Sequence, residues 1–227
     1  MSILKPLRKL LRPIRTAFSC LKILEIEYGH YRSSDQWTCL DKIGNPIPWY
    51  TYSTIEYLKQ LDFSDKIIFE YGSGNSSLFW ANRAKKVISV EDNSQWFDKV
   101  SKYNSKNLEI QLIEEKLAYT QSIQKYENFD TIIIDGSHRK ACAKEAIQKL
   151  NPGGMIVLDN SDWFPKTAEI IRYADFIQVD MAGFGPINYY TWTTSLFLHR
   201  EFNLKPKSSL QPTHAPGALA KHIDLGT

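Results

Sequence analysis

The stretch that decides the fold is KIIFEYGSGNSSLFWANRAKKVISVE, residues 66–91. It opens with a short apolar run, Lys66–Glu70, whose length and composition are typical of a buried strand. A turn rich in glycine and serine follows, then a helical segment from about Ser76, and then a second apolar run, Val87–Glu91. This order of strand, turn, helix and strand predicts two parallel strands joined by a helix.

The same alternation continues along the chain. Three further apolar runs are expected to form strands, namely Leu108–Ile113, Thr131–Asp135 and Met155–Asp159. Phe176–Asp180 and Thr191–Leu198 are expected to form an antiparallel edge hairpin around the loop Met181–Tyr190. We therefore predict an α/β fold, with a Rossmann-like, doubly wound, mostly parallel seven-stranded sheet and an antiparallel C-terminal edge hairpin.

The composition fits a globular protein of one domain with extensions. The chain has 227 residues, of which 43% are hydrophobic. We expect one domain over residues 25–202, with its ligand-binding core at about 62–160, and a loose polar tail over 203–227. The three cysteines form no CxxC pair, which favours a reduced, cytoplasmic setting, and no apolar run reaches the length of a membrane span.

The N-terminal residues 1–24 differ from the rest in charge. They contain six basic residues and no acid, whereas the remainder of the chain has a net charge of −3. Apolar residues recur there at helical spacing: Leu4, Leu7, Leu11, Ile14, Phe18 and Leu21. The pattern predicts a basic amphipathic helix, kinked at Pro13. Two interpretations stay open: the helix packs on the body or on a second copy in a homodimer, or it lies peripherally on an anionic membrane.

Polar residues follow four of the five predicted parallel strands, at the point where each strand ends. They are Glu70-Tyr71-Gly72-Ser73-Gly74, Glu91, Asp135 and Asp159-Asn160. In an open parallel sheet, ligands bind beyond the carboxyl ends of the strands. The sequence therefore predicts one binding site at this edge of the sheet.

The first of these clusters indicates the kind of cofactor. Gly72 and Gly74 allow a tight turn and a close approach of the backbone to a ligand. A dinucleotide fingerprint requires a third glycine at the position of Ser77. Glu70 would oppose a pyrophosphate but suits an ammonium group, and Glu91 is placed to accept hydrogen bonds from ribose hydroxyls. The residues indicate a nucleoside with a cationic tail and no phosphate.

These motifs together resemble those of the class I S-adenosylmethionine-dependent methyltransferases. The resemblance covers about residues 50–200 and includes Glu70-x-Gly72-x-Gly74, Glu91, Phe129–Asp135 and the turn Leu150–Gly154. It implies that S-adenosylmethionine is the cofactor. The residues that it implies for cofactor binding are Glu70, Gly72, Ser73, Gly74, Asn75, Glu91 and Asp135.

Within that superfamily, Asp135-Gly136-Ser137-His138 and Asp159-Asn160 resemble the metal-dependent small-molecule O-methyltransferases of the catechol, caffeoyl-CoA and macrocin types. A looser similarity is to the FkbM-type methyltransferases of polysaccharide clusters. The resemblance implies Mg²⁺ on Asp135, Asp159 and Asn160, and it implies His138 and Asp135 as catalytic residues with His138 as the base.

Each of these residues also has a plainer interpretation. Asp135, Asp159 and Asn160 could cap the following helix or turn, and His138 could be an exposed residue at a helix start. For Arg139 two roles stay open: it binds an anionic group of the substrate, or, as the plainer expectation, it is a solvated charge. Among the aromatic residues, Trp49 and Trp163 are predicted to form walls of an acceptor pocket, suited to a sugar or an aromatic ring.

Three functions follow from this reading. The first is O-methylation of a small molecule, a glycan or a lipid-linked sugar. The second is methylation of nucleic acid, but amino-directed enzymes of that class carry (Asp/Asn)-Pro-Pro-(Tyr/Phe) after the fourth strand, where this chain has Asp-Gly-Ser-His. No nucleic-acid partner is expected, because the body has no basic stripe with interleaved aromatics. The third is a binding module without catalysis.

Overall fold

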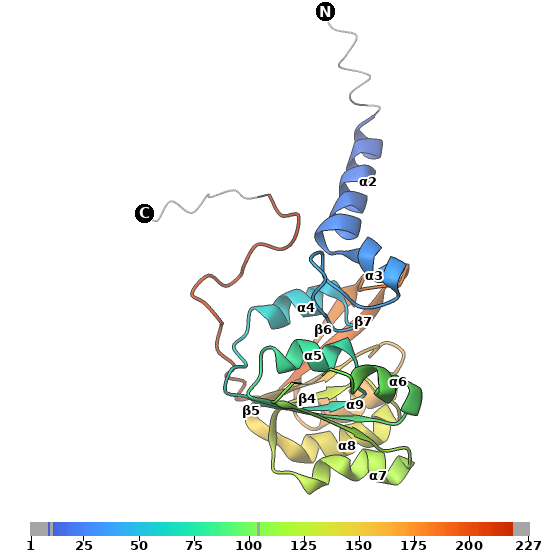
Figure 1. The fold of residues 1–227 in the computed structure, drawn as a ribbon. Coiled ribbons are helices and arrows are strands. Elements are labelled where there is room, and N and C mark those ends of the chain that lie inside the picture. Colours follow the sequence, from blue (N-terminus) through green and yellow to red (C-terminus); the bar gives the residue numbers. More distant parts are fainter. Residues whose placement is uncertain (1–8, 10, 104, 220–227) are drawn as a thin grey trace, which may run out of the picture.

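The computed structural model describes residues 9, 11–103 and 105–219, and within them one mixed seven-stranded sheet lies between two layers of helices (Figure 1). The strand order is β3-β2-β1-β4-β5-β7-β6. The strands are β1 (Ile67–Tyr71), β2 (Lys86–Glu91), β3 (Leu108–Leu112), β4 (Phe129–Ile134), β5 (Leu150–Leu158), β6 (Ile177–Gly183) and β7 (Trp192–Leu198).

Strands β1 to β5 are parallel, and the order reverses between β1 and β4, which pair directly from Ile68 with Thr131 to Tyr71 with Ile134. That reversal is the switch point at which open α/β sheets bind ligands. Strand β7 runs antiparallel to both β5 and β6. The predicted Rossmann-like sheet with an antiparallel C-terminal pair is therefore confirmed.

Two strand boundaries differ from the prediction by more than two residues. Residues expected in the hairpin loop, Met181–Gly183, extend β6, because they pair with Thr194, Thr193 and Trp192 of β7. The turn expected over residues 151–154 lies within β5 as an irregularity: Leu150 pairs with Phe129, and the next pair is Met155 with Thr131. Backbone pairing thus continues through Met181–Gly183, whereas residues 151–154 form a bulge between two successive pairs of β4 and β5.

The helices cover both faces of the sheet and form two apolar cores. They are α4 (Tyr52–Lys59), α5 (Asn75–Ala81), α6 (Ser94–Val100), α7 (Lys116–Gln121), the 3₁₀ turn η2 (Ser122–Lys125), α8 (Arg139–Lys149) and α9 (Pro165–Tyr173). One core packs Phe79 and Trp80 of α5 on the sheet, and the other packs Cys142 and Ala146 of α8 on the opposite face. Since both faces are covered, the central strands are apolar on both sides.

The N-terminal part stands apart from this body. Helix α2 (Arg12–Lys22) projects from it and buries no residue, and η1 (Ile23–Glu27) and α3 (His30–Gln36) connect it to the sheet (Figure 1). Pro13 lies in the first turn of α2, where no helical hydrogen bond is lost. Residues 1–8 and 10 of the predicted arm lie outside the described residues.

The segment after β7 runs back along α4. Asp62 and Lys207 donate backbone hydrogen bonds to Lys205 and Gln60, and Leu204 is buried in the first core. Among the helices that the structure describes, none is long and apolar enough to cross a membrane.

Candidate active site

The polar ends of β1, β2, β4 and β5 meet around one cleft of about 800 Å³. Sites for small ligands commonly measure roughly 300–1,000 Å³. Of the seven predicted cofactor-binding residues, six line this cleft: Gly72, Ser73, Gly74, Asn75, Glu91 and Asp135. Asp159 and Asn160 line it too. Parallel strands bring these residues together, although more than 80 positions separate the first from the last.

The two glycines of the loop after β1 serve different purposes. Gly72 has φ +90°, and a Cβ there would lie 2.8 Å from the backbone nitrogen of Gly136. Glycine is therefore required at position 72 because the loops after β1 and β4 are in close contact there. Gly74 is extended, and a Cβ there would meet Trp96 at 3.6 Å. The Trp96 indole donates to the carbonyl of Ser73, so this ring, which the sequence pattern marks only as part of a helix face, lies against the loop.

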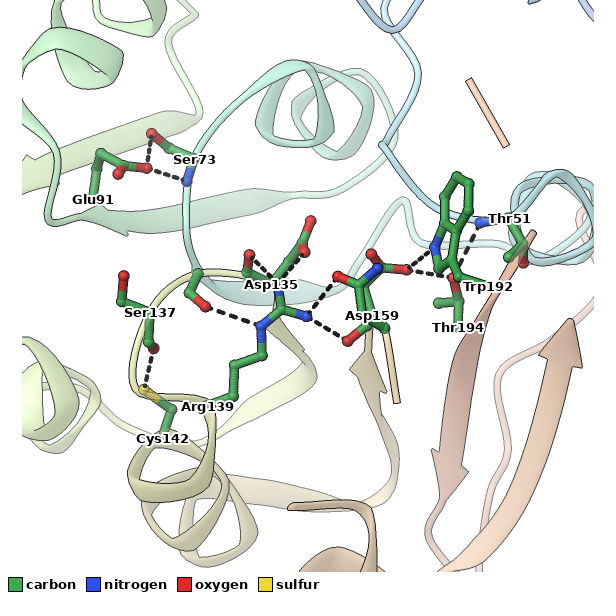
Figure 2. A network of polar contacts seen from close by, with 12 residues as sticks. Thr51, Ser73, Glu91, Asp135, Ser137, Arg139, Cys142, Asp159, Trp192 and Thr194 are labelled. Atoms are coloured by element: carbon green, nitrogen blue, oxygen red, sulfur yellow. Dashed lines mark hydrogen bonds and ion pairs between the residues drawn. The ribbon is translucent and has the colours of Figure 1, made fainter. Parts of the chain in front are cut away.

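Glu91 ends β2 and contacts Ser73 of the glycine loop directly (Figure 2), and both residues line the cleft. Its Oε2 accepts hydrogen bonds from the backbone nitrogen of Ser73 at 2.8 Å and from the Ser73 hydroxyl at 3.2 Å, and its Oε1 accepts from the Asn93 nitrogen at 3.0 Å. Burial raises the pKa of Glu91, and these hydrogen bonds oppose that rise. A carboxylate has about four acceptor positions, so the three bonds leave room for a further donor from the cleft.

Glu70 lies beneath the loop and does not line the cleft. Its Oε2 accepts from the hydroxyl of Ser89 at 2.6 Å and from that of Ser77, which in turn accepts from the Gly74 nitrogen at 3.1 Å. Among the described residues its Oε1 has no hydrogen-bond partner, and burial raises the pKa of Glu70 to about 7. Glu70 thus supports the loop from below, through the serine that replaces the third glycine of a dinucleotide fingerprint.

Arg139 joins the loops after β4 and β5 (Figure 2). Its Nε donates to the Gly136 carbonyl at 3.0 Å, and its Nη2 donates to the Asp135 carbonyl at 3.0 Å and to Asp135 Oδ1 at 3.1 Å. Its Nη1 donates to Asn160 Oδ1 at 3.2 Å and to the Asp159 carbonyl. The expectation that Arg139 is a solvated charge is wrong, since its side chain is 11% exposed.

The three predicted Mg²⁺ ligands do not turn toward a common point. Asp159 Oδ1 accepts from Trp192 Nε1 at 3.0 Å and from the Thr194 hydroxyl at 2.5 Å, on the side of β7. Asp135 and Asn160 bind the arginine instead. Within the described part of the chain, no group of three or more histidine, cysteine or acidic side chains could hold a metal ion. Because Arg139 holds Asp135 and Asn160 while Trp192 and Thr194 hold Asp159, the three predicted ligands do not fit a divalent ion.

The cleft gathers carboxyl groups that burial affects strongly. Burial raises the pKa of Asp135 to about 6, against the opposing charge of Arg139. The pKa of Asp159 is also raised, first by burial and then by the charge of Asp135. With Glu91 and Asp92 on the same lining, the site holds more negative than positive charge and suits a cationic ligand.

His138 lies outside this cleft. It precedes α8 with φ +54°, it is exposed, and its ring packs edge-on against Tyr119 with 6.2 Å between the centroids. It lines a separate hollow that also includes Lys116 and Lys140. The structure does not bring His138 to the other predicted site residues, and its role as a base stays a prediction without geometric support.

Aromatic side chains border the cleft at two places. Trp37 and Trp49 pack edge to face with 6.4 Å between the centroids, and Trp163 and Tyr190 lie 6.1 Å apart. Trp49 and Trp163, the predicted pocket walls, both line the cleft. Sequence reasoning missed Trp37, and it named Tyr190 only among the aromatic residues whose loops could reach the site. Both lie in irregular segments whose position over the sheet has no sequence signal.

Comparison with known proteins adds a fold assignment. No protein-family model and no curated protein matches the sequence. Among solved structures, precorrin-6y C5,15-methyltransferase from Geobacter metallireducens GS-15 is similar, with 15% identity and a TM-score of 0.51 over 73% of this chain and 96% of that one. The O-methyltransferase TomG from Streptomyces achromogenes, solved with S-adenosylmethionine, has 15% identity and a TM-score of 0.49 over 64% and 76% of the two chains.

A third structure is precorrin 8w decarboxylase from Methanobacterium thermoautotrophicum, with 14% identity and a TM-score of 0.48 over 67% of this chain and 91% of that one. At 15% identity, the likeness to the first of the three shows a Rossmann-like fold. Activity has to be argued from the site, since one fold serves many reactions.

Proposed function

We propose that the chain is an S-adenosylmethionine-dependent methyltransferase. The observation that carries the proposal is the Glu91 carboxylate, held over the glycine loop by Ser73 and Asn93 in the cleft that Asp135 also lines. The acceptor position that these bonds leave on the carboxylate suits a hydroxyl of a ribose. The excess of acids around the cleft suits the sulfonium and ammonium groups of the same cofactor.

The residues that would hold the cofactor are Glu91, at its ribose, and the loop from Gly72 to Asn75, along its amino-acid part. When bound, S-adenosylmethionine supplies an electrophilic methyl group that an acceptor oxygen takes as the sulfur–carbon bond breaks. The protein's part is to orient the acceptor and to take its proton, because displacement in line depends mainly on position.

Asp135 is suited to receive that proton. Its Oδ1 and its carbonyl are fixed by Arg139, while its Oδ2 accepts no hydrogen bond from any residue that the structure describes. The proton of the acceptor hydroxyl would pass to this free oxygen while the new oxygen–carbon bond forms, leaving S-adenosylhomocysteine and a methyl ether. We prefer Asp135 to His138 as the base, because only Asp135 lines the cleft.

For the acceptor we propose the hydroxyl of a neutral sugar, free or lipid-linked. The rings of Trp37, Trp49, Trp163 and Tyr190 offer flat apolar faces, and the amides of Asn160 and Asn188 offer hydrogen bonds to hydroxyls. The acidic lining would repel the phosphates of a nucleic acid or a nucleotide-linked acceptor, so a nucleic-acid methyltransferase is not favoured. Transfer of labelled methyl groups to a panel of neutral methyl glycosides tests this choice, with simple phenols and an oligonucleotide as the competing acceptors.

Calorimetry of S-adenosylhomocysteine binding tests the cofactor. We expect micromolar binding to wild type and weaker binding to Glu91→Ala by about 1–3 kcal/mol, because the ribose hydroxyls lose their acceptor. The matched control is Asp98→Ala, which removes an exposed acid of α6 outside the cleft and should bind like wild type. Absence of binding to the folded wild-type protein would overturn the proposed function.

Helix α2 bears on the place in the cell where the protein would bind its acceptor. We propose that it attaches the body to an anionic membrane, because Leu11, Ile14, Phe18 and Leu21 are all exposed on one face and basic residues flank them. Phe18→Glu should abolish sedimentation with phosphatidylglycerol vesicles. Thr16→Glu, with the same charge change on the opposite face, should weaken it less. Equal effects of the two variants would show that the apolar face does not enter the membrane.

A further inference from the structure

We infer that the guanidinium of Arg139 takes the place that the resemblance to metal-dependent O-methyltransferases assigns to a divalent cation, so that this chain works without one. A guanidinium has five N–H donors. All five are engaged, and every acceptor belongs to the loops after β4 and β5 (Figure 2). The side chain of Arg139 thus places a fixed positive charge between these two loops.

The oxygen atoms that it binds are of the kind that Mg²⁺ prefers. They include Asp135 Oδ1, Asn160 Oδ1 and the Asp159 carbonyl. Because the guanidinium already occupies them, a divalent ion at the same oxygens would be repelled by a fixed charge within a few ångströms. The carboxylate of Asp159 could offset that repulsion, but its Oδ1 accepts hydrogen bonds from Trp192 and Thr194 of β7, away from the guanidinium.

Several contacts hold Arg139 in this position. Its guanidinium carbon lies 4.6 Å from the centroid of the Phe164 ring, and its side chain is almost buried. To leave, it would have to give up five hydrogen bonds and the ion pair with Asp135. Lysine could not replace it, because its ammonium has three donors and no planar fork.

The consequence for catalysis rests on the proposed function: Arg139 orients Asp135, and methyl transfer needs no metal. The metal-binding test does not rest on it, since it uses the full chain without cofactor. Mn²⁺ is added and the signal of the free ion is followed by electron paramagnetic resonance. We expect wild type to leave that signal unchanged. Saturable binding that Asp135→Asn removes would overturn the inference.

Removal of the arginine should create the metal site. Arg139→Ala is expected to bind Mn²⁺ tighter than wild type by roughly tenfold or more, because the fixed charge is gone and the oxygens are free. Mn²⁺ should also raise its thermal midpoint. The matched control is Lys140→Ala, which removes the exposed neighbouring cation and should behave like wild type.

A folded Arg139→Ala protein with no gain in Mn²⁺ affinity would contradict the inference. If that variant does not fold, Arg139→Gln replaces it, since its shorter stem still packs near Phe164 and its amide adds an oxygen. A gain in Mn²⁺ affinity by Arg139→Gln would support the inference, and no gain by the folded variant would contradict it. A merely structural arginine predicts lower stability in these variants, but it does not predict a new metal site.

Discussion

The two halves of the cleft are built in different ways. The half that we propose for the cofactor, here called the cofactor half, is formed by Gly72–Asn75 and Glu91, and consists of a backbone turn and one carboxylate hydrogen-bonded to it. The half that we propose for the acceptor, here called the acceptor half, is formed by Asp135–Arg139 and Asp159–Asn160, and its side chains are joined by one arginine. The positions of the strand ends are enough to place the residues of the first half. The arrangement of the second half is decided by the orientation of its side chains, which the strand positions do not determine.

Among the variants that test the two halves separately, Asp135→Asn is expected to have the largest effect on activity. It should lower turnover with a neutral glycoside acceptor by roughly 10²–10⁴-fold, because the proton acceptor is lost. Binding of S-adenosylhomocysteine should change little, since Glu91 and the loop are untouched. Steady-state kinetics and calorimetry on the same preparation check both statements. Turnover close to that of wild type would show that another group takes the proton, and His138→Ala would then be examined.

This contrast also explains how much the sequence could predict. Apolar runs that end in an acid are enough to place Glu91 and Asp135 at the carboxyl edge of the sheet, as the structure shows. The direction of Asp159 could not be predicted, because its partners Trp192 and Thr194 lie more than 30 positions further along the chain. The role of Arg139 was missed because its link to the loop after β5 depends on Asp159 and Asn160, which lie 20 and 21 positions further along the chain.

Glu70→Gln tests the support beneath the cofactor half. The pKa of Glu70 is raised in the fold from 4.5 to about 7, so between these pH values the folded chain holds a proton that the unfolded chain has released. Glu70 therefore makes the free energy of unfolding fall as the pH rises through this range, by about 3 kcal/mol at most. Glutamine does not titrate.

As the pH rises from 4.5 to 7, the wild type should therefore lose stability relative to Glu70→Gln. The difference in their free energies of unfolding should shift in favour of the variant. Urea unfolding at several pH values measures it. Asp98→Asn, an exposed acid, is the control and should show no such shift. A difference independent of pH would mean that the fold does not raise the pKa of Glu70.

A smaller effect is expected from Trp163→Ala, at the rim of the acceptor half. Its ring is 56% exposed and lies beside Tyr190. Loss of this apolar face should raise KM for the glycoside by about tenfold, which corresponds to roughly 1.4 kcal/mol. The affinity for S-adenosylhomocysteine should stay the same. Tyr173→Ala, which removes an exposed ring remote from the lining, serves as the control.

The most direct test of the division into two halves is a crystal structure grown with S-adenosylhomocysteine. The ligand should lie in the cleft with its ribose hydroxyls within hydrogen-bonding distance of the Glu91 carboxylate. Its sulfur should face Asp135, with Arg139 still bound to Asp135 and Asn160. A ligand bound elsewhere, or a ribose that Glu91 does not contact, would contradict the account.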